Sequence, residues 1–359
     1  MGCGIEKLKL YKNNSAVSDI VSLILVVIIM VSTISVVLVW GVPEINKNKA
    51  DNRAENVISQ FNLIGDLIID DVVGQGYNSS KKVKFSSDMG SITVSSSETR
   101  IVFYYSIKEG FDFNVTGLFD DDETKFEYYG DNADWLNVYF LFDENKAAVS
   151  KPVPPNPPPA TNTVNLGANN PLTDAIMIDV VESDEIYGRI WLFDIGAITY
   201  LVNSQELYRA SVESGAVISD NYIENLPNFY IEDNLFYMQL IDLENTDITS
   251  VSWGGIDQTP RSIGLNLEKL NKQSNLIKFT VENNETYIRE DSRKIINNFK
   301  INISGNRKSE NAWRNYFEQI LDFNTFESGV AKDTLYRKKD DNFCFTFIQS
   351  TCDVYLEVS

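Results

Sequence analysis

Two cysteines near the C-terminus are the residues best placed for covalent chemistry. Cys344 and Cys352 lie on either side of Ser350, in two runs of alternating apolar residues that predict a closing hairpin. A disulfide between them would close a small loop and add roughly 2 to 3 kcal/mol to the stability by the chain-entropy estimate. We therefore expect a Cys344–Cys352 disulfide, which needs an oxidising compartment. A reduced pair would instead require a cytoplasmic location.

Carboxylates are the most abundant groups that could perform acid–base or metal chemistry. The chain has 51 Asp and Glu residues and no His, which excludes Ser-His and Cys-His nucleophiles and His-bearing metal sites. The densest acidic run, Asp120 to Glu123, lacks the spacing of an EF-hand, so we expect a solvated turn. The sequence has no glycine-rich phosphate loop, G-x-S-x-G elbow or CxxC pair. We predict no catalytic residue, cofactor or metal, and hence no enzyme.

Asparagines in Asn-x-Ser/Thr motifs form the remaining group of candidate sites. These acceptors for glycosylation are Asn78, Asn114, Asn284 and Asn302. Because the chain is rich in Asn, we expect most of the four to be unmodified. Their use requires that this part of the chain lies outside the cytoplasm.

Charge limits the kinds of partner. Lys and Arg number 31 against 51 Asp and Glu, which gives a net charge of −20. Such a surface repels phosphate backbones, so we predict no nucleic-acid ligand. Apolar residues form 43% of the chain and aromatic residues 12%, a composition that favours a folded and mostly β protein.

An uncharged apolar segment near the N-terminus predicts a helix that crosses a membrane, in contact with lipid through residues 17–40. At about 1.5 Å per residue, roughly 22 helical residues reach about 33 Å, which spans a hydrocarbon core of roughly 30 Å. Basic residues are balanced on both flanks, so orientation is inferred from the cysteine pair and the glycosylation motifs, which place the bulk of the chain outside the cell. A cleavable signal ending before Val42 is the alternative, but the apolar run is about twice the usual length.

The N-terminal residues also resemble a known family. A leader with Lys7, Lys9 and Lys12, the stretch Ser15 to Val21, and an uncharged helix together resemble the start of archaeal type IV pilins and pilin-like surface proteins. The strand-rich segment Gly188 to Ser219 resembles a stretch of such proteins as well. The resemblance implies a shared fold, bundling of the helices with copies of the chain or other pilin-like subunits, and processing by a prepilin peptidase.

The same resemblance assigns roles to residues at the start of the helix. Cleavage between Asn14 and Ser15 would place Asp19 at the fifth mature position, where pilins carry an acidic residue that pairs with a neighbour's terminal ammonium. A carboxylate at the edge of an apolar bundle does need a cationic partner. Asn13, Asn14 and Ser22 depart from the usual residues of the family. The other interpretation, that Asp19 caps a plain anchor helix, stays open.

Beyond the anchor we expect a hinge and then an amphipathic helix. Gly41 and Pro43 predict that the helix ends or kinks there. Apolar residues then recur at helical spacing up to residue 72; this stripe comprises Ala50, Ala54, Val57, Phe61, Ile64 and Ile68. The stripe could pack on the protein's own sheet or against copies of itself.

Short segments of period two follow and predict antiparallel β-sandwich domains. Six prolines in residues 151–160 predict an extended spacer between two β units; a long loop within one sandwich is the alternative. The expected organisation is a leader (1–14), a transmembrane helix (15–42), a helical stalk (43–75), a first β-rich domain (76–150), a Pro-rich linker (151–171) and a second β-rich domain (172–359).

The fold class is thus mainly β with a long N-terminal helix. The expected function is that of a structural or adhesive surface protein resembling an archaeal type IV pilin or minor pilin, single-pass in the cell membrane, extracellular in its bulk, and able to enter a filament. The alternatives are a monomeric membrane-tethered binding module and, motivated only by the abundance of carboxylates, an extracellular hydrolase.

Overall fold

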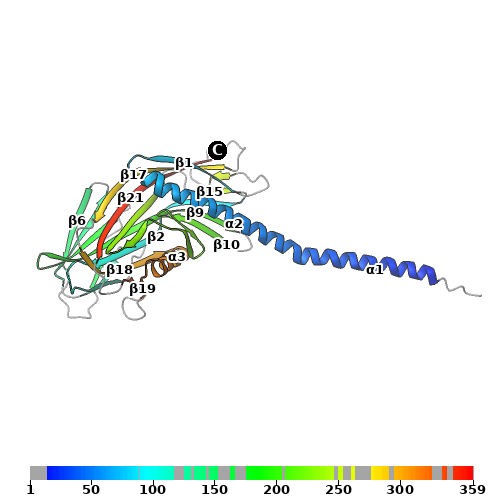
Figure 1. Cartoon of the computed structure of the whole chain (residues 1–359), viewed down its shortest axis with the longest axis horizontal. Coiled ribbons are helices and arrows are strands. Elements are labelled where there is room, and N and C mark those ends of the chain that lie inside the picture. Colours follow the sequence, from blue (N-terminus) through cyan, green and yellow to red (C-terminus); the bar gives the residue numbers. More distant parts are fainter. Residues whose placement is uncertain are drawn as a thin grey trace, which may run out of the picture. The chain divides into compact units, whose positions relative to one another are not determined.

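A computed structural model provides the structure of the protein. It describes residues 14–87, 89–116, 125–130, 133–142, 145–152, 162–165, 175–203, 207–245, 250–253, 260–262, 276–290, 295–325, 334–337 and 343–358. The chain divides into two compact units, Met1–Asn56 and Val57–Ser359, which are described one at a time. Figure 1 labels the elements along the chain.

The first unit is helical. Its elements are α1 (Asn14–Val36), the π-helical segment η1 (Val37–Gly41) and the beginning of α2 (Val42–Asp66). Large apolar side chains from Val21 to Val42 are 41–81% exposed. The hydroxyl groups of Thr33 and Ser35 donate hydrogen bonds to the carbonyl oxygens of the residues four positions earlier, at 2.7 and 2.8 Å, and so need no water. The helical run Val21–Val73 is long and apolar enough, at this end, to cross a membrane.

The helix does not end at Gly41 and Pro43. The expectation that it would end there is therefore wrong. The N–H of Val42 donates to the carbonyl oxygen of Val37, five residues earlier, and α2 follows directly. Proline removes one backbone donor and crowds the carbonyl of the fourth preceding residue. A π-helical turn shifts the hydrogen-bonding partner by one residue and so absorbs this defect without terminating the helix.

The second unit begins with the last turns of α2 and with the π-helical segment η2 (Leu67–Val73). One face of these turns carries Val57, Phe61, Ile64, Ile68 and Val72, each at most 2% exposed. They share a hydrophobic core with side chains of strands β1, β2, β9, β10, β14, β15, β17 and β21. The predicted amphipathic stripe is therefore confirmed from Val57 onward, and it packs on the protein's own sheet.

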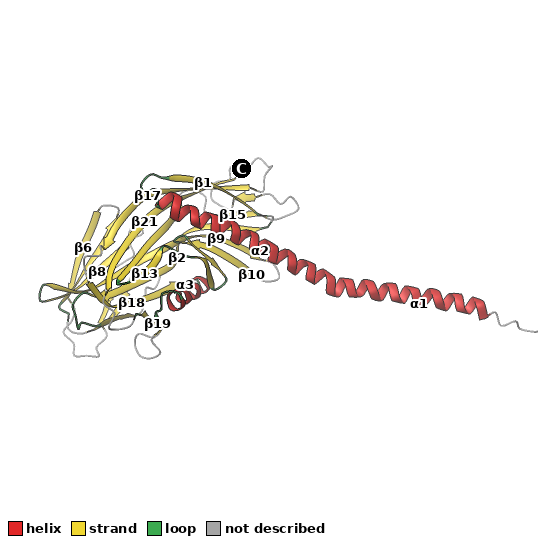
Figure 2. Ribbon diagram, viewed as in Figure 1, coloured by secondary structure: helices red, strands yellow, loops and turns green. Residues whose placement is uncertain are grey.

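The rest of the second unit is mostly β (Figure 2). Eighteen strands join into one curled sheet: β1 (Ser80–Ser86), β2 (Gly90–Ser106), β5 (Trp135–Phe142), β6 (Asn145–Pro152), β8 (Ala175–Glu182), β9 (Glu185–Asn203), β10 (Leu207–Glu213), β11 (Ala216–Ser219), β12 (Tyr222–Asn225), β13 (Phe229–Glu232), β14 (Leu235–Asn245), β15 (Ser250–Trp253), β16 (Pro260–Ser262), β17 (Leu276–Glu290), β18 (Ile295–Gly305), β19 (Asn324–Thr325), β20 (Leu335–Tyr336) and β21 (Phe343–Val358). A three-stranded sheet contains β3 (Phe113–Thr116), β4 (Lys125–Gly130) and β7 (Asn162–Asn165). The mainly β class with a long N-terminal helix is confirmed.

Strands β2 and β9 form the centre of one layer and pair antiparallel from Ser91↔Leu201 to Ser106↔Gly188. The facing layer contains β1, β17, β21, β14 and β13 in that order. Strand β18 joins the layers, because its first residues pair with β21 and the rest with β2. The layers are antiparallel as expected, except that β14 and β21 run parallel over their whole paired length.

The β region does not divide into the two domains expected on either side of the proline segment. Strand β2 pairs with β9, β1 with β17, and β5 with β8, so strands from residues 76–150 and 172–359 share one sheet. The alternative, one sandwich, describes this organisation. Residues 153–161, which hold most of the proline segment, lie outside the described residues.

Candidate functional site

The residues assigned to processing and assembly all lie on the first helix. Asn14, Ser15 and Asp19 belong to α1, whereas the basic leader lies outside the described residues. The roles assigned to these three residues stay predictions.

The predicted disulfide between Cys344 and Cys352 is wrong, because both thiols are free. The expected hairpin is instead one continuous strand, β21. Eight residues of extended strand separate the two by about 26 Å, whereas a disulfide needs Cα atoms within about 7 Å. Cys352 is fully buried in the core that contains Phe61, and burial raises the pKa of its thiol far above the ordinary value.

The four glycosylation motifs differ in exposure. Asn78 is exposed, and Asn114 and Asn284 are partly exposed. Asn302 is only 8% exposed, and its Nδ2 donates a hydrogen bond to the carbonyl oxygen of Val115 at 2.8 Å. Since Nδ2 is the atom that would carry a sugar, the fold corrects the assignment of Asn302 as an acceptor.

Metal binding finds no support in the described residues. Asp120 to Glu123 lie outside them, so the expected solvated turn is untested. Within the described ranges no group of three or more Cys, Asp or Glu side chains is arranged to hold a metal ion.

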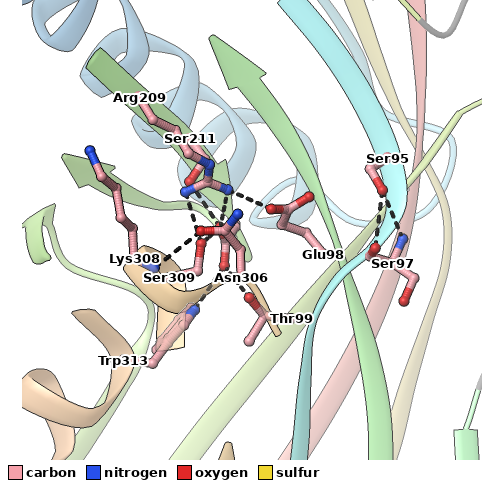
Figure 3. Close-up of polar contacts among 11 residues, drawn as sticks. Ser95, Ser97, Glu98, Thr99, Arg209, Ser211, Asn306, Lys308, Ser309 and Trp313 are labelled. Atoms are coloured by element: carbon pink, nitrogen blue, oxygen red, sulfur yellow. Dashed lines mark hydrogen bonds and ion pairs between the residues drawn. The ribbon is translucent and has the colours of Figure 1, made fainter. Parts of the chain in front are cut away.

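Buried polar side chains of β10 meet those of helix α3 (Arg307–Gln319), and Figure 3 shows Arg209 and Ser211 beside Ser309 and Trp313. Glu213, at the end of β10, accepts hydrogen bonds from both elements. Glu213 is fully buried. Its Oε2 accepts hydrogen bonds from Thr99 Oγ1 at 2.8 Å and Trp313 Nε1 at 3.0 Å. Its Oε1 accepts from Ser211 Oγ at 2.8 Å and Ser309 Oγ at 2.5 Å. Every lone pair that this carboxylate needs to satisfy has a donor, as a buried charge requires.

Arg209 completes this cluster from the same face of β10. One guanidinium nitrogen donates to Ser309 Oγ at 2.9 Å, and the other lies 2.7 Å from Glu98 Oε1 and 3.5 Å from Glu213 Oε1. Burial raises the pKa of Glu98 above its ordinary value, and the neighbouring Arg209 charge lowers it only in part. The cluster joins α3 to the sheet. Its two carboxylates, Glu98 and Glu213, both pair with Arg209.

A second buried ion cluster lies between β8, β9 and β17. Arg189 Nε donates to Asp179 Oδ1 at 2.6 Å, and Arg189 Nη1 pairs with Glu290. Burial by itself lowers the pKa of Arg189, but the hydrogen bond to Asp179 and the nearby negative groups raise it further, so the guanidinium stays charged. Burial raises the pKa of the adjacent Tyr105 hydroxyl well above its ordinary value. The positive charge of Arg189 is thus paired with two buried carboxylates, as in a structural ion cluster.

A third polar cluster involves alternating residues of β18. Asn298, Lys300 and Asn302 lie on one face of the strand, and their side-chain nitrogens donate to the carbonyl oxygens of Phe111, Phe113 and Val115. The opposite face of β18 contributes Phe299, Ile301 and Ile303 to the main core.

None of the three clusters was predicted, although a signal is visible in the sequence. Arg209, Ser211 and Glu213 alternate with the apolar Ala210 and Val212, and β18 alternates in the same way. Such alternation is typical of a strand with one solvated face. Here the polar face is covered by another element, which a period of two does not reveal.

Comparison of the chain with protein-family models, with curated proteins and with solved structures finds no match.

Proposed function

We propose that this chain is a structural or adhesive surface protein of the pilin-like kind, with residues 17–40 in a membrane and the β unit outside the cell. The observation that carries the proposal is the composition of one helical run, Val21–Val73, which is uncharged and exposed near its start and amphipathic with a buried stripe near its end. In this proposal the helix that lies in the membrane continues into the helical turns that belong to the core of the β unit.

Lipid or a bundle of identical helices is the environment that suits the first part of this run. Apolar side chains exposed all around a helix are stable in a bilayer or among other apolar helices, whereas in water each exposed methylene costs about 0.8 kcal/mol. The internally bonded hydroxyls of Thr33 and Ser35 suit the same surroundings. The tip of the segment carries Trp40, a residue favoured at membrane interfaces.

Assembly into a filament is the finer part of the proposal. It rests on the leader, Ser15 and Asp19, where a cleaved N-terminus would supply the ammonium for a neighbour's carboxylate. Mass spectrometry of the protein from its native membrane tests this, because cleavage predicts a chain that starts at Ser15. An intact Met1 would contradict processing and leave a plain anchored protein.

A second candidate, a monomeric membrane-tethered binding module, is favoured by the burial of the amphipathic stripe. Because Val57 and Phe61 are at most 2% exposed, this face is occupied by the protein's own sheet and does not serve association between copies. The exposed helix face near Val31 and Ile34 is therefore the place to look for a neighbour.

Cysteine cross-linking distinguishes the two candidates. In a chain whose native cysteines are replaced by alanine, Val31→Cys and Ile34→Cys should form dimers in native membranes if the helices bundle. Val57→Cys is the matched control and should not cross-link. Absence of dimers at Val31 and Ile34, in membranes where the protein is folded, would favour the monomeric module.

Hydrolysis has weaker support. The carboxylates that the described residues bring together, Glu98 with Glu213 and Asp179 with Glu290, are each bridged by a buried arginine. General acid–base chemistry needs one carboxyl to give and another to take a proton at a substrate. We therefore keep the absence of enzymatic activity as part of the proposal.

A further inference from the structure

Lys300 stands apart from the other buried cations. The described residues include three buried basic side chains, Arg189, Arg209 and Lys300. Each arginine is paired with two carboxylates that are themselves mostly buried. Lys300 is 4% exposed, but its carboxylate partner, Asp112, has a side chain that is 37% exposed. The carboxylate of the Lys300–Asp112 pair is therefore more open to solvent than those of the arginine pairs.

The atoms around Lys300 Nζ include an amide that an amine can attack. Nζ lies 2.5 Å from Asp112 Oδ1, 2.6 Å from the carbonyl oxygen of Phe113 and 2.8 Å from Asn114 Oδ1. The oxygen in the last contact is bonded to Cγ of Asn114, so the amine lies close to the carboxamide carbon that it would attack. Reacting groups held at such separations gain the large advantage of an intramolecular reaction.

Aromatic and apolar side chains surround this group. The ring of Tyr104 lies 5.8 Å from Nζ and 5.3 Å from the ring of Phe113, and both residues are at most 2% exposed. They belong to a core cluster with Phe111 and Val115. Apolar surroundings limit the access of water, so attack by the amine, once Asp112 has taken its proton, competes well with hydrolysis of the amide.

We propose that Lys300 and Asn114 form an intramolecular isopeptide bond. Asp112 accepts a proton from the ammonium, and the neutral Nζ attacks Cγ of Asn114. The Nζ–Cγ bond forms, the Cγ–Nδ2 bond breaks, and Nδ2 takes up the protons released by Nζ and leaves as ammonium. The product is a secondary amide, Asp112 returns to a carboxylate, and no oxidant or reductant takes part.

The bond would join the large sheet to the three-stranded sheet. Lys300 is on β18 and Asn114 on β3, and they are 186 residues apart in the chain. Cross-linking removes the buried charge and closes a long loop, which restricts the unfolded state. Separation of the two sheets under load would then require breaking a covalent bond.

Modification of Asn114 by a sugar is the competing outcome at the same atom. Asn114 begins an Asn-x-Thr motif, and glycosylation would occupy the Nδ2 that the isopeptide reaction expels. The two modifications exclude one another on one chain. A cross-linked Asn114 would support the proposal, whereas a glycosylated or unmodified Asn114 would overturn it.

Peptide mapping of the full-length protein is the test, and it does not depend on where the protein is located. Digestion with trypsin should yield a branched peptide that contains Lys300 and Asn114, lighter than its two linear parts by one ammonia molecule. Fragment spectra should locate the branch at these two residues. Stoichiometric recovery of the unbranched peptides, or of a glycan on Asn114, would overturn the proposal.

Variants assign the roles of the atoms. Lys300→Met and Asn114→Ala should abolish the branched peptide, and Asp112→Ala should reduce its yield strongly while leaving both reacting residues in place. A branched peptide at full yield in Asp112→Ala would overturn the assigned proton transfer. Lys308 is the internal control: its Nζ lies 2.8 Å from Asp220 Oδ1, and no branch is expected there. Because the unmutated protein decides the main question, a variant that fails to fold does not obscure it.

Discussion

Two parts of the same helical run have opposite surroundings. Between Val21 and Val42 the large apolar side chains are 41–81% exposed, whereas from Val57 to Val72 those of the stripe are at most 2% exposed. Both parts are regular helix, so hydrogen bonding within the backbone does not distinguish them. The difference lies in the apolar side chains: those of the second part are buried within the chain, and those of the first part are exposed on it. This contrast can be tested by changes made in matched pairs.

Removing a large side chain from the buried part should have the greatest effect. Phe61 is fully buried, and its ring lies 5.4 Å from that of Phe85. Phe61→Ala should lower the free energy of unfolding of the β unit by about 3 to 5 kcal/mol, because it removes apolar contacts and leaves a cavity. Denaturant unfolding of the full chain in detergent, followed by tryptophan fluorescence, measures this.

Ile28→Ala is the matched change in the exposed part, where Ile28 is 58% exposed. It should leave the unfolding midpoint of the β unit unchanged. Equal losses from Phe61→Ala and Ile28→Ala would show that the helix does not divide in the way described.

Glycines offer a second pair with a smaller expected effect. A Cβ added to Gly65 would lie 2.6 Å from the carbonyl oxygen of Gly215, a backbone atom that cannot rotate away, whereas one added to Gly41 would meet only Val37 Cγ1 at 3.7 Å. Gly65→Ala should therefore destabilise the β unit by about 1 to 3 kcal/mol through overpacking. Gly41→Ala should not. Thermal unfolding of both variants checks this, and a tolerated Gly65→Ala would contradict the close approach of helix and turn.

The sequence allows this contrast to be predicted in outline. Hydropathy identifies the uncharged segment, and the 4-3-4 spacing of Val57, Phe61, Ile64 and Ile68 identifies the buried stripe. Alternation and turn residues, which are local signals, also predict correctly that the chain after the helix is mainly β. The lengths of the strands were not predicted. The two segments expected on either side of Ser350 are one strand, β21, because no glycine or proline interrupts it there.

Contacts distant in sequence account for what was missed. Asn306 caps helix α3, and Ser309 in its first turn donates to Glu213, which is 96 residues away in the chain. Lys300 and Asn114 are ordinary polar residues of their strands until the fold brings them together. Periodicity reports which residues share a face and not what covers that face, so buried polar sites of this kind remain outside its reach.

Gln60 and its neighbour Ser59 provide a third pair of variants, for which we expect a smaller loss of stability. Gln60 Nε2 donates to the carbonyl oxygen of Ser86 at 3.0 Å, and the N–H of Ser86 donates to Gln60 Oε1 at 2.8 Å, as a neighbouring strand would. Gln60→Ala should cost about 1 to 2 kcal/mol, the range for losing two partly exposed hydrogen bonds. Ser59→Ala, at an exposed neighbouring position, is the control and should cost nothing measurable. Equal stability of the two variants would contradict the role of Gln60.

Chemical labelling of the native cysteines gives the gentlest test, first in the unmutated protein and then in the first pair of variants. Cys344 is partly exposed, while Cys352 is buried in the core that contains the helical stripe, with its thiol pKa raised by burial. A maleimide reagent at neutral pH should modify Cys344 readily and Cys352 only as the core opens, because a buried, protonated thiol is a poor nucleophile. Peptide mass spectrometry of timed samples separates the two sites. Phe61→Ala should accelerate labelling at Cys352 and not at Cys344, whereas Ile28→Ala should change neither. Fast labelling of Cys352 in the unmutated protein would mean that the stripe and the sheet do not form one core.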